Sequence, residues 1–285
     1  MNELERAIMT SSCADCAGIA KVREAGRIRD TPTGPIQVMH NGLRMKAGGY
    51  HGDWMAQIIR ALRGHHEPQE ELVFHHILRY VRHNSLIVEL GSFWCYYTLW
   101  YLHEIANASA ICIEPDPKNL QLGKNNASLN RLESRISFHN GCVGGESLEG
   151  LELRCESDGL VRTVPCFDMA AVSQLANRNI EILHMDVQGA ELPFIRSMAA
   201  AVEGRQVRFV VVSTHHSSIS GSRTTHADCR DALLDFGAVI LAEHDVQQSY
   251  SGDGLIAASF FPEDRRIELP PVSLNKASLS LFPER

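Results

Sequence analysis

The chain lacks any long apolar segment of the kind that crosses a membrane. No run of about 18 apolar residues occurs, so a transmembrane helix is not expected. The first residues, Met1 to Arg6, contain neither the basic region nor the apolar core of a secretory signal peptide. We therefore expect a protein without a membrane partner and with a cytoplasmic location.

The chain also lacks an excess of positive charge. Its 27 Lys and Arg residues are outnumbered by 34 Asp and Glu residues, which leaves a formal net charge of −7. General nucleic-acid binders carry a basic face, so we do not expect a nucleic-acid partner. The length of 285 residues suits one α/β domain with an extra segment, or two small domains.

Paired metal-ligand motifs are scarce. Cys13 and Cys16 have C-x-x-C spacing, but no second pair follows, which argues against a zinc site. The pairs at residues 65–66 and 75–76 are His-His without a His-Glu-x-x-His motif, and we interpret them as part of an exposed helix face. The eight scattered cysteines fit buried free thiols in a reducing compartment.

Two short apolar runs are the most informative features that are present. Residues 85–91 end in Glu89, Leu90 and Gly91, and residues 110–115 end in Glu114 and Pro115. Such runs are typical of buried parallel strands whose carboxyl ends open onto a ligand crevice. A glycine there lets the backbone approach a ligand, and a carboxylate there suits a ribose. Together they predict a nucleoside-containing cofactor on a doubly wound sheet.

The rest of the chain alternates between strand-like and helix-like segments. Strands are expected at residues 85–91, 110–114, 136–140, 180–186, 207–213, 238–243 and 254–260. Helices are expected at residues 54–62, 68–81, 96–105, 117–129, 190–201 and 225–235 and as a short segment after Asp168, with a β excursion at 146–166 and a turn at 249–254. Asn41-Gly42 predicts a hairpin ahead of these elements. The pattern predicts an α/β fold with a mainly parallel sheet and helices on both faces.

The expected crevice brings several polar residues together. Glu114 is expected to accept hydrogen bonds from the ribose hydroxyls, although it would alternatively serve only to cap the following helix. Glu89 or its neighbouring backbone would receive an ammonium group. Asn140 or the following backbone would meet an adenine edge.

The loop after the first of these strands decides between cofactors. A dinucleotide needs glycines at the helix start for its pyrophosphate. Residues 91–95 instead contain one glycine and two large aromatic residues, Phe93 and Trp94. This disfavours NAD and an oxidoreductase, and it favours a ligand without phosphate such as S-adenosylmethionine.

Four segments resemble the FkbM-type methyltransferases: residues 86–93, 113–117, 126–130 and 185–191. The resemblance covers roughly residues 65–260, and Asp186 to Glu191 is its most specific part. It implies an S-adenosylmethionine-dependent enzyme with the class I Rossmann-like, seven-stranded, mainly parallel sheet, acting on hydroxyl oxygens of sugars or natural products. The resemblance implies roles in cofactor binding for Glu89, Gly91, Glu114 and Asp186. With the residues of the expected crevice, the predicted cofactor-binding residues are Glu89, Gly91, Ser92, Phe93, Tyr96, Glu114, Pro115, Asn140, Cys142 and Asp186. Glu89, Ser92, Phe93 and Cys95 replace the usual Asp, Ala, Asn and second Gly, and His184 stands where Lys is common.

Methyl transfer to an alcohol needs a proton acceptor, and a histidine suits that task. His215 and His216 end a strand expected beside the Asp186 strand, so we predict one of them as general base, with Asp186 in the catalytic group. In an alternative, Asp186, His215 and His216 hold a divalent ion such as Mg²⁺. A non-catalytic S-adenosylmethionine-binding protein is a further alternative.

The expected organisation has three parts. Residues 1–65 form an N-terminal extension of helix and hairpin that shapes the acceptor pocket or a homodimer contact. Residues 66–265 form the S-adenosylmethionine-binding methyltransferase domain, and residues 266–285 form an irregular tail. The expected partner is a small hydroxylated acceptor: a sugar, a glycosylated metabolite or a polyketide-like molecule.

Overall fold

A seven-stranded sheet forms the centre of the computed structural model, which describes residues 3–283. Its strands lie in the order β12-β13-β11-β10-β4-β5-β6. Their bounds are Leu86–Leu90 (β4), Ser109–Glu114 (β5), Ile136–Asn140 (β6), Ile180–Met185 (β10), Val207–Thr214 (β11), Val239–His244 (β12) and Gly254–Ser259 (β13). The pairs from β11 to β6 are parallel, whereas β13 runs antiparallel to both β11 and β12. The predicted mainly parallel seven-stranded sheet is confirmed.

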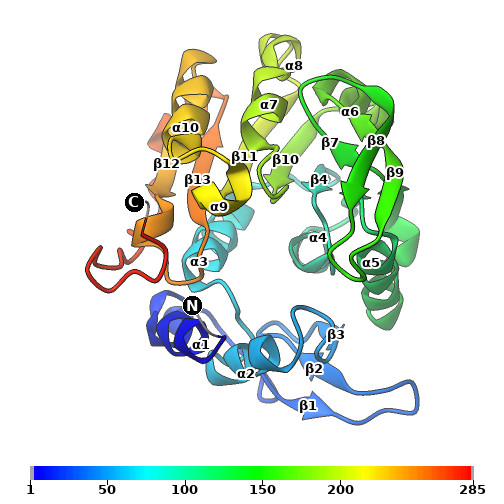
Figure 1. Cartoon of the computed structure of the whole chain (residues 1–285), viewed down its shortest axis with the longest axis vertical. Coiled ribbons are helices and arrows are strands. Elements are labelled where there is room, and N and C mark those ends of the chain that lie inside the picture. Colours follow the sequence, from blue (N-terminus) through cyan, green and yellow to red (C-terminus); the bar gives the residue numbers. More distant parts are fainter. Residues whose placement is uncertain (1–2, 284–285) are drawn as a thin grey trace.

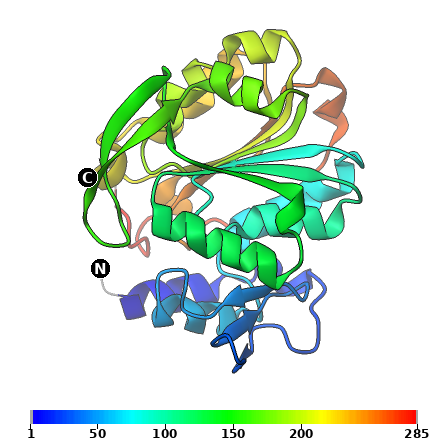
Figure 2. The ribbon, with the colours of Figure 1, turned by 90° about the vertical axis from the view of Figure 1, so that its right-hand side faces the viewer.

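Helices cover both faces of this sheet, as Figures 1 and 2 show. One face carries α3 (Pro68–Ile77), α4 (Tyr96–Glu104) and α5 (Pro117–Leu129), and the other carries α6 (Met169–Ala176), α7 (Glu191–Arg196), α8 (Ala199–Glu203) and α10 (Thr225–Asp235). Side chains alternate along a strand, so in β4 Ile87 packs into the core of the first face, whereas Val88 and Leu90 pack into the core of the second.

The strand order reverses between β4 and β10. From β4 the chain moves outward through β5 to β6, and it later returns to β10 and moves the other way to β11. Ligands of open α/β sheets bind outside the carboxyl ends of the strands at such a reversal. The topology therefore predicts a ligand site among the residues that follow β4, β5 and β10.

The chain ahead of α3 forms a separate layer beneath α3, α4 and α5 (Figures 1 and 2). It contains α1 (Glu3–Ser12), η1 (Asp15–Gly18), β1 (Ile28–Arg29), β2 (Ile36–Val38), β3 (Arg44–Lys46) and α2 (Asp53–Ala61). Strands β2 and β3 pair antiparallel on either side of Asn41-Gly42, which confirms the predicted hairpin. Met45 and Ile58 enter the same core as Trp100, so this layer and the helices above it share one core.

Residues 142–167 form a smaller sheet next to β6, in the place of the predicted β excursion. Its strands are β7 (Cys142–Val143), β8 (Leu148–Arg154) and β9 (Val161–Phe167), in the order β7-β9-β8. The remaining short elements are η2 (Leu78–Tyr80), η3 (Glu133–Arg135), α9 (Ser217–Ser220), η4 (Val246–Gln248) and η5 (Pro262–Arg266).

The described part of the tail, residues 267–283, contains no helix or strand. It returns to the beginning of the chain, where the Ser273 hydroxyl donates to Asp15 and the Phe282 ring lies 5.6 Å from the Arg6 guanidinium. The N-terminal helix and the tail therefore meet near the turn that precedes β13.

The helix predicted over residues 190–201 is interrupted between α7 and α8. The Ser197 hydroxyl donates to the Phe194 carbonyl over 2.7 Å, a local bond that competes with regular helical hydrogen bonding. None of the described helices is both long and apolar enough to span a membrane.

Candidate active site

A cavity of about 1180 Å³ opens at the carboxyl ends of β4, β5 and β10. The β7–β9 sheet forms one wall, and the N-terminal layer contributes Arg6, Tyr50 and His51 to another. Eight of the predicted cofactor residues line it: Glu89, Gly91, Ser92, Phe93, Glu114, Pro115, Cys142 and Asp186. The cavity lies where the sequence predicts a cofactor crevice.

Gly91 directly follows β4, at a point where the backbone comes very close to the end of β10. Its φ is +73°, and a Cβ placed there would lie 1.7 Å from the carbonyl oxygen of Asp186. The Asp186 N–H in turn donates to the Leu90 carbonyl over 3.0 Å. Only glycine fits this crossing, which joins the cofactor loop to the end of β10.

The rest of the loop adopts left-handed conformations without glycine. Phe93 has φ +39° and Cys95 has φ +63°, a conformation that costs about 1–2 kcal/mol for a residue with a Cβ. The Cys95 thiol packs against α5, where a Cβ on Gly123 would lie 2.6 Å from the sulfur. Packing against α5 thus stabilises a turn in which the second glycine of the family pattern is absent.

Glu114 ends β5 with its carboxylate held firmly at the cavity wall. One oxygen accepts the N–H of Phe93 and the other accepts the N–H of Asp116, both over 2.9 Å. Burial raises the pKa of Glu114 to about 7, against the lowering effect of these two N–H groups. The cap of α5 is Asp116, which accepts the Lys118 N–H. The alternative that Glu114 only caps this helix is therefore wrong.

Asn140 stabilises the cavity edge from outside. Its amide donates to the carbonyls of Glu114 and Pro115 over 2.9 and 2.8 Å. The cavity wall at this edge consists of Gly141 and Cys142 instead. The prediction that the Asn140 side chain meets the adenine is not supported, whereas its alternative, the following backbone, is in position.

Asp186 follows β10 and belongs to a buried chain of charged groups. Its Oδ1 lies 3.1 Å from His215 Nε2, and His215 Nδ1 lies 2.7 Å from Glu191 Oε1. His215 is fully buried, and its Nε2 also lies 3.6 Å from Asp253. Burial acts to lower the pKa of His215, but the three carboxylates around it raise that pKa well above its ordinary value.

His215 does not line the cavity, and both of its ring nitrogens have partners. Its Nδ1 is hydrogen-bonded to Glu191 Oε1, and its Nε2 lies 2.8 Å from the amide nitrogen of Gln188. The predicted role of His215 as general base or metal ligand is therefore not supported by this arrangement. Beside Asp186, His215 holds the pKa of that carboxyl below its usual range even though burial acts to raise it.

His216 lies away from the cavity wall. It caps α9, where its Nδ1 accepts the Ser218 N–H over 3.1 Å. Its Nε2 lies 3.3 Å from the Pro283 carbonyl. This position does not support the prediction of His216 as base, and within the described residues Asp186, His215 and His216 do not converge as a metal site.

Several residues without a predicted role also line the cavity: Tyr50, His51, His66, Glu67, His184 and Asp253. Glu67 accepts the hydroxyls of Tyr97 and Tyr50 over 3.0 and 3.3 Å. Tyr50 also stacks on Trp94, with ring centroids 4.6 Å apart. His65 and His66 are buried, so the exposed helix face expected for them is wrong. The sequence contains one indication of the position of Asp253: the glycines on either side of it predict a tightly packed turn.

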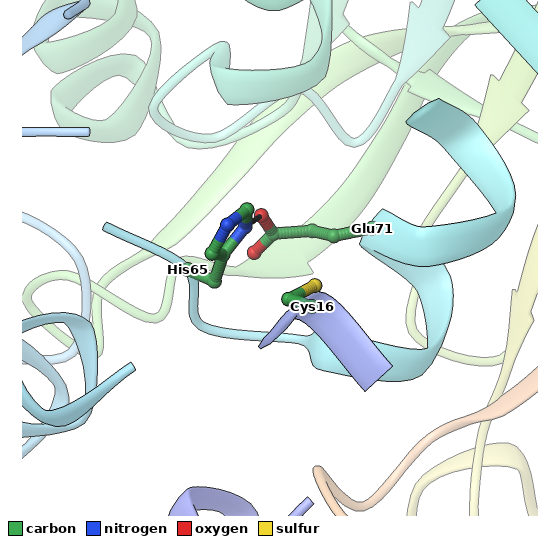
Figure 3. Close-up of side chains that lie close together, drawn as sticks. All are labelled: Cys16, His65 and Glu71. Carbon is green, nitrogen blue, oxygen red and sulfur yellow. Dashed lines mark hydrogen bonds and ion pairs between the residues drawn. The ribbon is translucent and has the colours of Figure 1, made fainter. Parts of the chain in front are cut away.

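A second group of polar side chains lies beneath the cavity, at the junction of η1 and α3 (Figure 3). Within the described residues, Cys16, His65 and Glu71 bring possible ligand atoms within 4.8 Å of one another. However, the Cys16 thiol donates to the Pro68 carbonyl over 3.2 Å, and Glu71 Oε2 accepts from His65 Nδ1 at 2.5 Å. Burial also raises the pKa of the Cys16 thiol. We interpret this group as a hydrogen-bond network, not as a metal centre.

Tyr96 belongs to the same network. Its hydroxyl donates to Glu71 over 3.0 Å and lies 3.1 Å from His40 Nδ1. It stands apart from the residues that line the cavity, so the predicted contact between Tyr96 and the cofactor is not supported.

Comparisons with solved structures give methyltransferases of low sequence identity. An O-methyltransferase from Bacillus cereus in complex with SAH is 13% identical, with 67% of this chain and 79% of that chain covered and a TM-score of 0.40. M. capricolum TrmK in complex with S-adenosyl-homocysteine is 10% identical, with 73% of each chain covered and a TM-score of 0.41. A precorrin-6y C5,15-methyltransferase from Geobacter metallireducens is 10% identical, with 66% and 86% covered and a TM-score of 0.41. Similarity at this level carries no information on the acceptor.

The family comparison is decisive. No curated protein matches the sequence significantly. The family described as "Methyltransferase FkbM domain" matches residues 82–240 of the 285, more than half of the chain. This segment contains β4 to β11 and most of the cavity wall. The protein therefore belongs to the FkbM methyltransferase family, has the class I fold, and uses S-adenosylmethionine as methyl donor.

Proposed function

We propose that this protein transfers a methyl group from S-adenosylmethionine to a hydroxyl oxygen of a small acceptor: a sugar, a glycosylated metabolite or a polyketide-like molecule. The observation that carries the proposal is one cavity that is lined both by the residues expected to hold the donor and by further carboxylates. Gly91, Glu114 and Cys142 line it together with Asp186 and Asp253, and Gly91 lies directly against the Asp186 carbonyl. A donor held by Gly91 and Glu114 would therefore lie close to the carboxylate of Asp186.

The polar groups of the cavity suit this donor. Glu114 is positioned to accept hydrogen bonds from the ribose, and Glu89 is positioned to receive the ammonium group. Burial raises the pKa of Glu89 to about 7, and a bound cation would favour its charged form. Ser92 Oγ and His184 Nδ1 line the cavity, are buried and have no hydrogen-bond partner among residues 3–283. Buried polar atoms of this kind are expected to bind a ligand.

The donor supplies an electrophilic methyl group on a sulfonium, and the protein must orient the acceptor oxygen and exclude water. Tyr50 and Trp94 provide aromatic surface at the cavity wall, and Glu67 provides carboxylate oxygens. Aromatic faces beside carboxylates suit a hydroxylated ring with one apolar face. In this proposal the N-terminal layer contributes to the acceptor site through Tyr50.

The charge of the cavity supports an acceptor without phosphate groups. Its described lining contains nine carboxylates: Glu67, Glu89, Glu114, Asp116, Glu146, Glu152, Glu156, Asp186 and Asp253. Two arginines, Arg6 and Arg154, lie among them. Such an excess of negative charge repels phosphate and suits the positive charge of the donor.

Methyl transfer to a panel of hydroxylated acceptors tests the proposal, with radioactive S-adenosylmethionine and with and without EDTA. We expect transfer to at least one sugar or polyketide-like acceptor, and we expect it to persist in EDTA because the three candidate metal ligands do not converge. S-adenosylhomocysteine should raise the melting temperature in the same samples. Transfer only to amines or to nucleic acid would contradict the proposal, and loss in EDTA restored by Mg²⁺ would favour the metal-assisted alternative.

The ribose contact of Glu114 has its own test. The variant Glu114→Gln is expected to weaken S-adenosylhomocysteine binding by about 1–3 kcal/mol, because a charged hydrogen-bond acceptor is removed. Isothermal titration calorimetry measures the change. The matched variant Glu149→Gln, on the exposed face of β8, should bind as the wild type does. Equal affinity in the two variants would contradict the proposed contact between Glu114 and the ribose.

A further inference from the structure

We propose that Asp253 is the proton acceptor of methyl transfer, and that Glu191 and His215 act as positioning residues that hold Asp186 and Asp253 at the cavity wall. The proposal rests on the proposed transfer to a hydroxyl oxygen and deepens it. It replaces the histidine base expected from the sequence with a carboxylate.

Asp253 has an open position at the cavity wall. Its side chain is 20% exposed, and its nearest charged partners are His215 Nε2 at 3.6 Å and Arg6 Nη2 at 3.9 Å. Among residues 3–283 no hydrogen bond to its carboxylate is found within 3.5 Å, whereas Asp186 accepts one from Gln188 over 3.1 Å. Asp253 therefore keeps lone pairs that face the cavity, as a general base requires.

The turn that carries Asp253 is tightly packed on both sides. A Cβ on Gly252 would lie 2.7 Å from the Phe282 ring, and a Cβ on Gly254 would lie 2.5 Å from the Thr214 hydroxyl. The guanidinium of Arg6 donates to the Ser251 carbonyl over 2.7 Å. The N-terminal helix, β11 and the tail thus fix the carboxylate before an acceptor arrives, and such preorganisation lowers the barrier of the reaction.

The buried side of the site is a chain from Glu191 through His215. Glu191 is fully buried, and its Oε1 accepts the Gly189 N–H over 3.0 Å as well as His215 Nδ1. His215 Nε2 lies 2.8 Å from the amide nitrogen of Gln188, 3.1 Å from Asp186 Oδ1 and 3.6 Å from Asp253 Oδ1. The buried ring thus lies against both carboxylates, and it is closer to Asp186 than to Asp253.

The electrostatic surroundings suit proton transfer near neutral pH. Burial and the charge of Asp186 raise the pKa of Asp253 to about 6, although His215 and Arg6 act to lower it. The groups that face it are Arg6 from α1, Tyr50 from the N-terminal layer, Glu67 ahead of α3, Asp186 after β10 and His215 after β11. Asp253 is therefore charged at pH 7 and still basic enough to accept a proton.

In the chemical step, the acceptor oxygen forms its bond to the methyl carbon while the carbon–sulfur bond breaks, and the electron pair of that bond stays on sulfur. The acceptor O–H bond breaks and its proton passes to an oxygen of Asp253. The products are the methyl ether, the neutral thioether of the donor and a protonated Asp253, which then releases its proton to solvent.

The central experiment compares Asp253→Asn with the wild type on an acceptor found in the panel. We expect turnover to fall by about 10²–10⁴-fold, the usual effect of losing a general base. S-adenosylhomocysteine affinity and melting temperature should stay near wild type. The matched variant Asp235→Asn, on the exposed end of α10, should keep wild-type turnover.

The pH profile separates a chemical role from a structural one. Wild-type kcat/KM should fall as the pH drops through about 6, because Asp253 becomes protonated there. This fall is the acidic limb of the pH profile, and the residual activity of Asp253→Asn should lack this limb. Glu191→Gln should move the limb to higher pH, since a less basic His215 no longer lowers the pKa of Asp253. An unmoved limb in Glu191→Gln would overturn the positioning role. Unchanged turnover in Asp253→Asn would overturn the assignment of Asp253 alone, whereas a wild type that methylates no hydroxyl would overturn it together with the proposed function.

Discussion

The variant Gly91→Ala is expected to lose S-adenosylhomocysteine binding and about 4 kcal/mol or more of its free energy of unfolding. Its new Cβ would lie 1.7 Å from the carbonyl oxygen of Asp186, which is backbone and has no rotamer with which to move away. A φ of +73° adds about 1–2 kcal/mol of strain. Since β4 and β10 pair up to Leu90 and Met185, separating their ends would open the sheet at the cavity.

The control for this prediction is another glycine with a similar backbone conformation. Gly237 has φ +81°, and no atom lies within 4 Å of the position that a Cβ would take there. Gly237→Ala should therefore lose only the unfolding free energy that corresponds to the backbone strain, about 1–2 kcal/mol, and donor binding should stay intact. Chemical denaturation and calorimetry measure both quantities. If the two variants lose the same stability, the close approach of Gly91 to Asp186 has no energetic consequence.

The variant Glu71→Ala is expected to lose about 3–5 kcal/mol of unfolding free energy, the usual effect of breaking a buried charged pair. Glu71 is fully buried at the start of α3 and accepts the N–H groups of His66 and Glu67 over 2.7 and 3.1 Å. It also accepts His65 Nδ1 and the Tyr96 hydroxyl. Its loss would leave these donors buried without a partner between the N-terminal layer and α4.

The pH dependence of stability provides a second measurement. Burial acts to raise the pKa of Glu71, but His65 and His66 hold it well below its usual range. A carboxyl with a lowered native pKa adds stability above its unfolded pKa of about 4, and that stability is lost as the pH falls further. Glu71→Ala should therefore lose less stability on acidification than the wild type does. The exposed Glu104→Ala should stay within about 0.5 kcal/mol of the wild type, and an equal loss in both variants would contradict the role of Glu71.

The cofactor end of the site was predictable from local sequence. Runs such as residues 86–90 and 109–114 are apolar and β-branched, which identifies them as buried parallel strands. The carboxyl ends of parallel strands lie at one edge of a sheet, so Gly91, Glu114 and Asp186 had to lie close together. Asn140 and Tyr96 show the limit of this reasoning, because a position near that edge does not determine the direction of a side chain.

The acceptor end was not predictable in the same way. Local pattern assigned residues 65–66 to an exposed helix face, whereas packing of the N-terminal layer buries both histidines. The same packing brings Tyr50 to the cavity wall, although Tyr50 is far in sequence from most of the other residues of that wall. These contacts depend on long-range packing, which produces no periodic pattern in the sequence.

Local residue patterns were enough to predict the family, the mainly parallel sheet and the edge at which the cavity opens, because strand periodicity and loop chemistry are properties of neighbouring residues. The surroundings of His215 and Asp253 followed only from the folded arrangement. Glu191, His215 and Asp253 come from separate segments that the pairing of β11 with β10 and β13 brings together. The pKa of a buried imidazole depends on the carboxylates that surround it in space, so the proposal of Asp253 in place of a histidine base could be argued only from the tertiary structure.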